Sequence, residues 1–84
     1  MSELELYTET YEFKGVGKAF ISKLSKEGQS NFMVDFVCFE SKKNIRFKGR
    51  GELFEAKQCV VSIASPYVEN LSEKNLKNYL TNRE

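Results

Sequence analysis

Apolar and polar residues alternate with a period of two along most of the first 65 positions, a pattern that predicts β-strands. The most apolar segment is Phe32–Phe39, in which aromatic and β-branched residues occupy both faces and only Asp35 interrupts them. It is too short for a typical buried helix, so we expect a central strand there. The segment Ile45–Phe54 alternates apolar residues with arginine and lysine, which predicts a strand with a basic outer face. Runs rich in aromatic, β-branched and threonine residues predict further strands over residues 2–13, 18–24 and 58–65.

Short polar segments separate the predicted strands and indicate tight turns. Gly15-Val16-Gly17 predicts a hairpin or a bulged bend, and Ser25–Gln29 is a polar turn centred on glycine. Ser41–Asn44 predicts the next turn, and Pro66 ends the last strand because proline has no N–H to donate to a ladder. Connections this short favour antiparallel neighbours.

The period changes from two to that of a helix near the C-terminus. Asn70 or Ser72 can cap a helix, and Leu76 and Leu80 recur at helical spacing. We therefore expect an amphipathic helix over about residues 71–82. A helix of this length is marginal alone, so it must pack on the sheet or, as the alternative, on a partner protein.

Length and composition complete the fold prediction. The chain has 84 residues, of which 40% are hydrophobic and 30% charged, as in an ordinary globular protein. We expect one small α+β domain over residues 1–84, with strands within about residues 3–65 and one C-terminal helix. The sheet is expected to be five-stranded and mostly antiparallel, either twisted or curled into a small, partly open barrel. The predicted core is Phe13, Phe20, Ile21, Phe32, Val34, Phe36, Cys38, Ile45, Phe47, Leu53, Val61, Ile63, Leu76 and Leu80.

A short motif occurs twice at an offset of 34 residues, as Phe13-Lys14-Gly15-Val16-Gly17 and as Phe47-Lys48-Gly49-Arg50-Gly51. Either the chain duplicates a β-hairpin unit, or the match is a coincidence in a sequence rich in lysine and phenylalanine. Glycine at both paired positions indicates a bend or a close backbone approach. The motif does not predict a phosphate-binding loop, because it lacks a third glycine and no helix is expected to follow it. It also lacks the stacking aromatics of RNA-recognition domains, and the sequence resembles no family.

Charge is distributed unevenly, although 13 basic and 12 acidic residues leave a net charge of only +1. Residues 2–13 contain four glutamates and no basic residue, whereas five of the nine residues in Lys42–Arg50 are basic and none is acidic. Alternation would place Arg46, Lys48 and Arg50 on one strand face about 7 Å apart, close to the spacing of phosphates along a nucleic-acid strand.

Two interpretations of this basic segment remain open. Its cations can pair with the acidic N-terminal strand, that is with Glu3, Glu5, Glu9 or Glu12, and serve only as a solvated face. Alternatively they bind an anionic partner, either a nucleic acid or an acidic protein surface. The candidate residues for such a site are Lys14, Lys18, Arg46, Lys48 and Arg50.

The residues needed for catalysis or metal binding are scarce. The chain has no histidine, and Asp35 is its only aspartate. Cys38 and Cys59 lie within apolar runs and lack metal or redox spacing, so we expect buried, reduced cysteines; a disulfide or a reactive thiol is the alternative. We expect no enzyme activity, no metal and no cofactor.

These observations predict a small, non-catalytic binding module that acts as an adaptor, regulator or inhibitor through protein–protein contact. The alternative is a nucleic-acid-binding β module that uses the basic strand face. A homodimer formed through an exposed sheet edge is a further expectation. The N-terminus lacks a basic and apolar leader, and no apolar run approaches the roughly 20 residues of a membrane span, so we expect a cytoplasmic protein without membrane contact.

Overall fold

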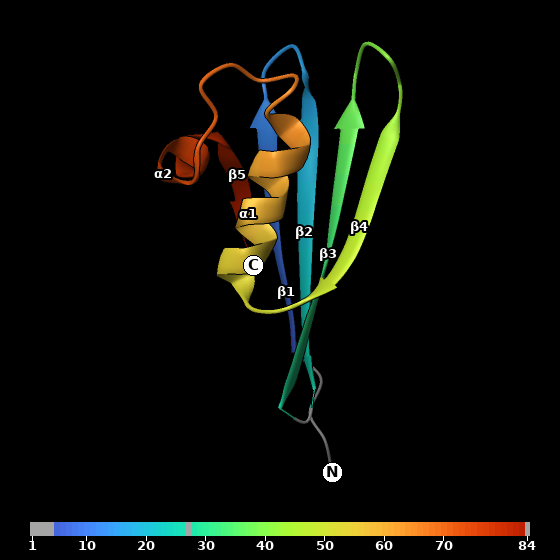
Figure 1. The fold of residues 1–84 in the computed structure, drawn as a ribbon, viewed down its shortest axis with the longest axis vertical. Coiled ribbons are helices and arrows are strands. Elements are labelled where there is room, and N and C mark those ends of the chain that lie inside the picture. The colour runs from blue at the N-terminus through green and yellow to red at the C-terminus, as the bar shows by residue number, and fades with distance from the viewer. Residues whose placement is uncertain (1–4, 27, 84) are drawn as a thin grey trace.

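The structure, a computed structural model, describes residues 5–26 and 28–83. Its elements are β1 (Glu5–Phe13), β2 (Gly17–Lys26), β3 (Gln29–Cys38), β4 (Asn44–Arg50), α1 (Leu53–Ala64), α2 (Glu73–Leu76), the 3-10 helix η1 (Lys77–Tyr79) and β5 (Leu80–Arg83). The strands form one antiparallel sheet in the order β4-β3-β2-β1-β5, and α1 packs on one face of it (Figure 1). The predicted α+β fold with a five-stranded antiparallel sheet is confirmed, and the sheet is open.

Tight turns join the first four strands at the predicted places. Between β1 and β2, the N–H of Val16 donates to the carbonyl of Phe13 at 2.8 Å, and Gly15 has a φ of 76°. That angle lies in the left-handed region, which glycine adopts without steric cost. Local sequence therefore determines the hairpins of this sheet.

The prediction of a strand over residues 58–65 is wrong, because this segment belongs to helix α1. Ala56, Val60 and Ala64 recur every four residues and are fully buried against the sheet. The two alanines let the helix backbone approach the sheet closely, whereas the β-branched residues around Val60 favour a strand by local propensity. Gly51, with a φ of 144°, separates α1 from β4, so the strand expected over 45–54 ends at Arg50.

The expected C-terminal helix over residues 71–82 is much shorter than predicted. Ser72 caps α2 as expected: its hydroxyl accepts from the N–H of Asn75, whose side chain accepts from the N–H of Ser72. After one turn of α2 and η1, the chain becomes extended, and β5 pairs with the outer edge of β1. That pairing satisfies backbone groups of β1 that a helix in this place would leave without partners.

The core lies between α1 and the sheet. Of the predicted core, the buried residues are Phe13, Ile21, Phe32, Val34, Phe36, Cys38 and Leu76, while Ile45, Leu53, Val61, Ile63 and Leu80 are partly buried against it. The prediction is wrong for Phe20 and Phe47, which are 37% and 45% exposed. Phe20 lies on the face that α1 does not cover, and Phe47 lies on the edge strand β4, beside α1 rather than beneath it.

The two copies of the repeated motif do not form equivalent units. The first copy spans the end of β1, the turn and the start of β2. The second copy lies within β4 and the residue that follows it. Gly15 therefore supports a turn, while its counterpart Gly49 lies inside a strand. The interpretation of the motif as a duplicated β-hairpin is wrong.

Candidate functional site

Within residues 5–26 and 28–83, one face of the sheet carries no helix, and we call it the open face. It consists of the even-numbered residues of β1, β2 and β4 and the odd-numbered residues of β3, because the pairing register keeps these side chains on one side. α1 packs on the opposite face (Figure 1). A partner could therefore reach the open face without displacing the helix.

The structure brings together three of the five predicted site residues. Arg46, Lys48 and Arg50 are exposed neighbours on the open face of β4, spaced about 7 Å apart. Lys18 is half-buried on the open face of β2, two strands away from β4. Lys14 lies in the turn that precedes β2 and does not share the strand of the other cations. The predicted basic strand face is confirmed for β4, whereas Lys14 is separate from it.

The acidic N-terminal strand does not cover the basic strand. β2 and β3 lie between β1 and β4, which puts the two strands about 14 Å apart. Glu9 faces α1 and is buried, and Glu12 lies on the open face opposite Lys18. Glu3 lies outside the described residues. The side chain of Glu5 is likewise not described, and for Glu9 and Glu12 the interpretation in which β1 neutralises β4 is wrong.

Asp35 provides the acidic partner on the neighbouring strand. It lies opposite Arg46 in the β3–β4 register, and the Nε of Arg46 donates to its Oδ1 at 2.8 Å. Within residues 5–26 and 28–83, neither Lys48 nor Arg50 forms an ion pair. Two exposed cations of β4 thus remain available to an anionic partner.

A shallow groove of about 640 Å³ lies beside these cations on the open face. Leu6, Leu24 and Met33 contribute its apolar surface, and Lys48 and Arg50 lie along one side. Leu6, on β1, forms the side of the groove farthest from β4 and is 63% exposed. An apolar floor beside free cations is typical of a protein-binding surface with a polar rim.

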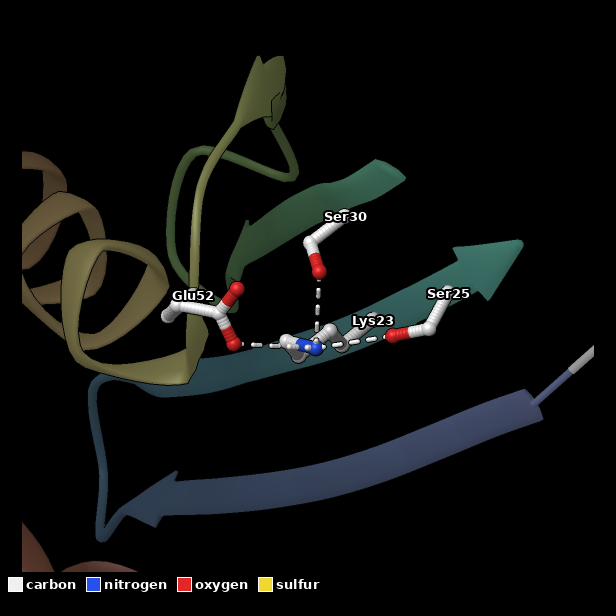
Figure 2. Close-up of polar contacts among 4 residues, drawn as sticks. All are labelled: Lys23, Ser25, Ser30 and Glu52. Atoms are coloured by element: carbon white, nitrogen blue, oxygen red, sulfur yellow. Dashed lines mark hydrogen bonds and ion pairs between the residues drawn. The ribbon is translucent and has the colours of Figure 1, made fainter. Parts of the chain in front are cut away.

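On the opposite face, Lys23 links the sheet to the start of α1. Its Nζ lies 2.9 Å from the Oγ of Ser25, 3.5 Å from the Oγ of Ser30 and 3.4 Å from a carboxylate oxygen of Glu52 (Figure 2). Glu52 is the residue that precedes the first turn of α1. These contacts connect the end of β2 and the start of β3 with the residue that precedes α1.

Replacing Lys23 with methionine is expected to lower the free energy of unfolding by about 1 kcal/mol, because it removes two hydrogen bonds and one ion pair while preserving most of the apolar stem. Urea denaturation measures the change. Lys26→Met, at the exposed end of β2, is the matched control and should shift stability by less than about 0.5 kcal/mol. Equal effects at the two positions would contradict a structural role for the Lys23 contacts.

A second polar cluster, which sequence reasoning missed, lies inside the core. Glu9 is only 2% exposed, and its carboxyl oxygens accept hydrogen bonds from the hydroxyls of Tyr7 and Tyr11. Tyr7, Glu9 and Tyr11 alternate along β1 and therefore share one face of the strand. This alternation in the sequence could have predicted that Glu9 lies beside the two tyrosines. The cluster lies on the α1 side of the sheet, and its hydrogen bonds satisfy buried polar groups.

Stability should fall at alkaline pH because of Tyr11. Burial, and then the hydrogen bond to Glu9, raise the pKa of Tyr11 well above its ordinary value of 10.0. The unfolded chain therefore loses this proton first, so the contribution is complete below about pH 10 and is lost as pH rises further, by up to about 1.4 kcal/mol per pH unit. Urea denaturation between pH 9 and pH 11 measures this slope. Tyr11→Phe should have a shallower slope, and an unchanged slope would contradict the assignment.

The two cysteines lie on different elements and are not joined in a disulfide. Cys38 is buried at the end of β3, Cys59 is half-buried on α1, and both are free. Burial, with a smaller effect of Glu55, raises the pKa of the Cys59 thiol, whereas hydrogen bonds from Ser41 lower the pKa of Cys38. The part of the chain that the structure describes contains no cluster of three potential metal ligands.

We also searched the described helices for membrane spans and compared the chain with known proteins. None of the described helices is long and apolar enough to cross a membrane. No family model, curated protein or solved structure matches the chain. Its function is therefore inferred from its own residues.

Proposed function

We propose that this protein is a small, non-catalytic binding module that acts as an adaptor, regulator or inhibitor by docking an acidic region of a partner protein on β4. The observation that carries this proposal is the pair of exposed cations, Lys48 and Arg50, which form no ion pair within the described residues and flank an apolar groove. We place its action in the cytoplasm, where the free Cys38 and Cys59 would stay reduced.

The residues around Lys48 and Arg50 favour a protein partner over a nucleic-acid partner. Met33, opposite Lys48, begins an apolar strip that continues through Leu24 to Leu6 across the open face, as expected for the apolar part of a protein interface with a polar rim. Nucleic-acid interfaces are more polar and far more basic. The net charge of +1 adds little long-range attraction for a phosphate backbone.

Nucleic-acid binding is the second candidate. Its support is the row of three basic side chains on β4, whose spacing of about 7 Å suits successive phosphates. Phe20 is 37% exposed on the same face, two strands from β4, and could stack on a base. The acidic side chains of Glu12 and Asp35 on this face oppose it.

Charge reversal tests the proposed function. The double variant Lys48→Glu with Arg50→Glu should weaken capture of an acidic partner from host lysate by at least about tenfold, because like charges then face each other. Lys74→Glu with Lys77→Glu, on the exposed surface of α2 and η1, has the same net charge and should capture the partner normally. Quantitative mass spectrometry of the captured proteins gives the ratio. Equal loss in both variants, or in neither, would contradict docking on β4.

Binding assays with labelled oligonucleotides test the second candidate function, nucleic-acid binding. Single- and double-stranded probes should show no saturable binding by fluorescence anisotropy, even at low salt. Binding that weakens steeply with added salt, and that disappears in the Lys48→Glu, Arg50→Glu variant, would favour the nucleic-acid function instead.

A further inference from the structure

We propose that the free edge of β4 binds an extended acidic segment of a partner protein by β-strand addition. The apolar side chains of that segment would enter the groove between β4 and α1, and its carboxylates would face Arg46, Lys48 and Arg50. This inference rests on the proposed function, since it assumes that the partner is a protein, and it specifies the shape and the chemistry of the docking segment.

The first observation is the hydrogen-bonding pattern of β4. Within the described residues β4 pairs with β3 alone, so its other edge has no neighbouring strand. The N–H of Gly51 donates to the carbonyl of Ser30 at 3.0 Å, and the N–H of Cys38 donates to the carbonyl of Lys43 at 3.0 Å.

These two bonds belong to one antiparallel register, in which residues that bond to the neighbour alternate with residues that do not. The odd-numbered residues of β4 therefore bond to β3. The N–H and C=O groups of Arg46, Lys48 and Arg50 point to the free edge. The residues that carry the basic side chains are thus the ones that offer backbone groups to an added strand.

The second observation is a groove beside this edge, on the face opposite the open face. It has a volume of about 490 Å³ and lies between β4 and α1, with Phe32, Phe47, Cys59 and Ile63 in its lining. α1 runs over the middle of the sheet, while β4 lies at its margin (Figure 1). Phe47 is consequently 45% exposed, and a side chain from an added strand could cover it.

Gly49 keeps this groove open. A Cβ at this position would lie 2.8 Å from the ring of Phe32 and 3.0 Å from the ring of Phe47. The absence of a side chain lets the two rings approach to 6.1 Å between centroids beside the strand. The edge therefore combines an accessible apolar surface with unpaired backbone groups.

The third observation is the positive charge of β4, which indicates what kind of segment would bind to its edge. A strand added to β4 would place its own open-face side chains about 5 Å from Arg46, Lys48 and Arg50. Opposite charges at such positions stabilise pairing, and the opposite face of the same strand would meet the apolar groove. The fitting segment therefore alternates aspartate or glutamate with valine, leucine or an aromatic residue.

The same charges disfavour a second copy of this chain on the edge. Antiparallel pairing of β4 with itself would bring arginine and lysine opposite arginine and lysine, because β4 contains no acidic residue. Like charges directly opposite each other destabilise a sheet, and basic edge residues commonly prevent self-association. β4 thus selects a foreign acidic strand over its own copy.

A set of labelled peptides tests the proposal with the intact protein. The probe is a fluorescein-labelled peptide of about eight residues, in which glutamate alternates with valine and leucine, a length that matches β4. Control peptides have the same composition in block order, lysine in place of glutamate, or N-methyl groups on alternate amides. Only the first probe should bind, with each control at least about tenfold weaker by anisotropy. Failure of the alternating probe to bind would overturn the inference.

Backbone variants of the protein test the mode of binding. Lys48→Pro removes the lysine charge and one backbone N–H, which points to the free edge, while the ladder to β3 is kept. Lys48→Ala keeps that N–H and removes the charge. We expect at least about tenfold weaker probe binding for Lys48→Pro and a loss of only a few-fold for Lys48→Ala. Circular dichroism checks that both variants fold, and the N-methylated peptide gives the same test without any change to the protein.

Amide exchange gives a direct readout in the wild-type protein. The amide hydrogens of Arg46, Lys48 and Arg50 should exchange rapidly in the free protein and become protected when the probe binds, whereas those of Phe47 and Gly49 should be protected in both states. Rapid exchange at Lys48 in the complex would contradict strand addition.

The outcomes separate this inference from the proposed function. If the probe binds but the proline variant and the methylated peptide behave normally, docking uses side chains alone; strand addition is then wrong, and protein binding stands. If no acidic peptide binds but charge reversal still abolishes partner capture, the inference alone fails. If charge reversal has no effect on capture, the proposed function fails. A dimer in analytical ultracentrifugation that Lys48→Pro abolishes would show that the edge pairs with a second copy, and would overturn the choice of a foreign partner.

Discussion

Phe36→Ala is expected to lower the free energy of unfolding of this protein by about 3–5 kcal/mol, the largest loss that we predict for a single substitution. Phe36 is fully buried near the end of β3, and its ring centroid lies 6.2 Å from that of Phe13 and 5.5 Å from that of Tyr67. Truncation of a buried phenylalanine costs about 3–5 kcal/mol, because apolar area and packing contacts are lost and a cavity remains. A chain of this length is stable by only about 4–13 kcal/mol. Urea denaturation of the variant should show a midpoint far below that of the wild type.

Phe20→Ala is the matched control for this prediction. Phe20 lies on the next strand but on the open face, where it is 37% exposed. Its truncation should cost less than about 1.5 kcal/mol, because part of its surface already contacts water. Equal destabilisation at the two positions would mean that a second layer covers the open face, which would contradict the docking surface.

Glu9→Leu is expected to be the next most damaging change, with a loss of about 2–3 kcal/mol at neutral pH. Leucine is apolar and therefore suits a buried position, but it cannot accept the hydrogen bond from the hydroxyl of Tyr11. The side chain of Tyr11 is only 1% exposed, so this hydroxyl would lose its acceptor in the core. An unsatisfied buried donor costs more than a hydrogen bond contributes when it is formed. Urea denaturation measures this loss as well.

A double-mutant cycle shows whether the hydroxyl is the cause. Tyr11→Phe should destabilise the wild-type protein, whereas in the Glu9→Leu background it should cost nothing or restore some stability. Additive costs would contradict the hydrogen bond as the source of the effect. Because this cluster and the Phe36 core lie on the α1 side of the sheet, variants of Lys48 and Arg50 should fold normally, and binding can be measured separately from stability.

Much of the sheet was predictable from the sequence because its signals are local. Alternation identified β1, β2, β3 and β4, and glycines and polar residues marked the hairpins that join them. The same alternation placed Arg46, Lys48 and Arg50 on one face of β4. A strand has a side-chain period of two, so neighbouring residues alone determine which side chains share a face.

The candidate docking surface, in contrast, could not be predicted from local sequence, because it depends on the tertiary structure. Residues 53–64 became a helix because Ala56, Val60 and Ala64 could pack on the sheet, although the branched residues among them favour a strand. The strand order then separated acidic β1 from basic β4 and left the β4 edge without a neighbour among the described residues.

The sequence by itself thus determined the first four strands, the turns between them and the basic face of β4. Only the tertiary structure decided that Asp35, rather than Glu9 or Glu12, pairs with this face, and that Lys48 and Arg50 remain without an ion pair in the part of the chain described. The physical reason is that charge pairing depends on which strands become neighbours. That choice follows from how the whole chain buries its apolar residues, and no local pattern encodes it.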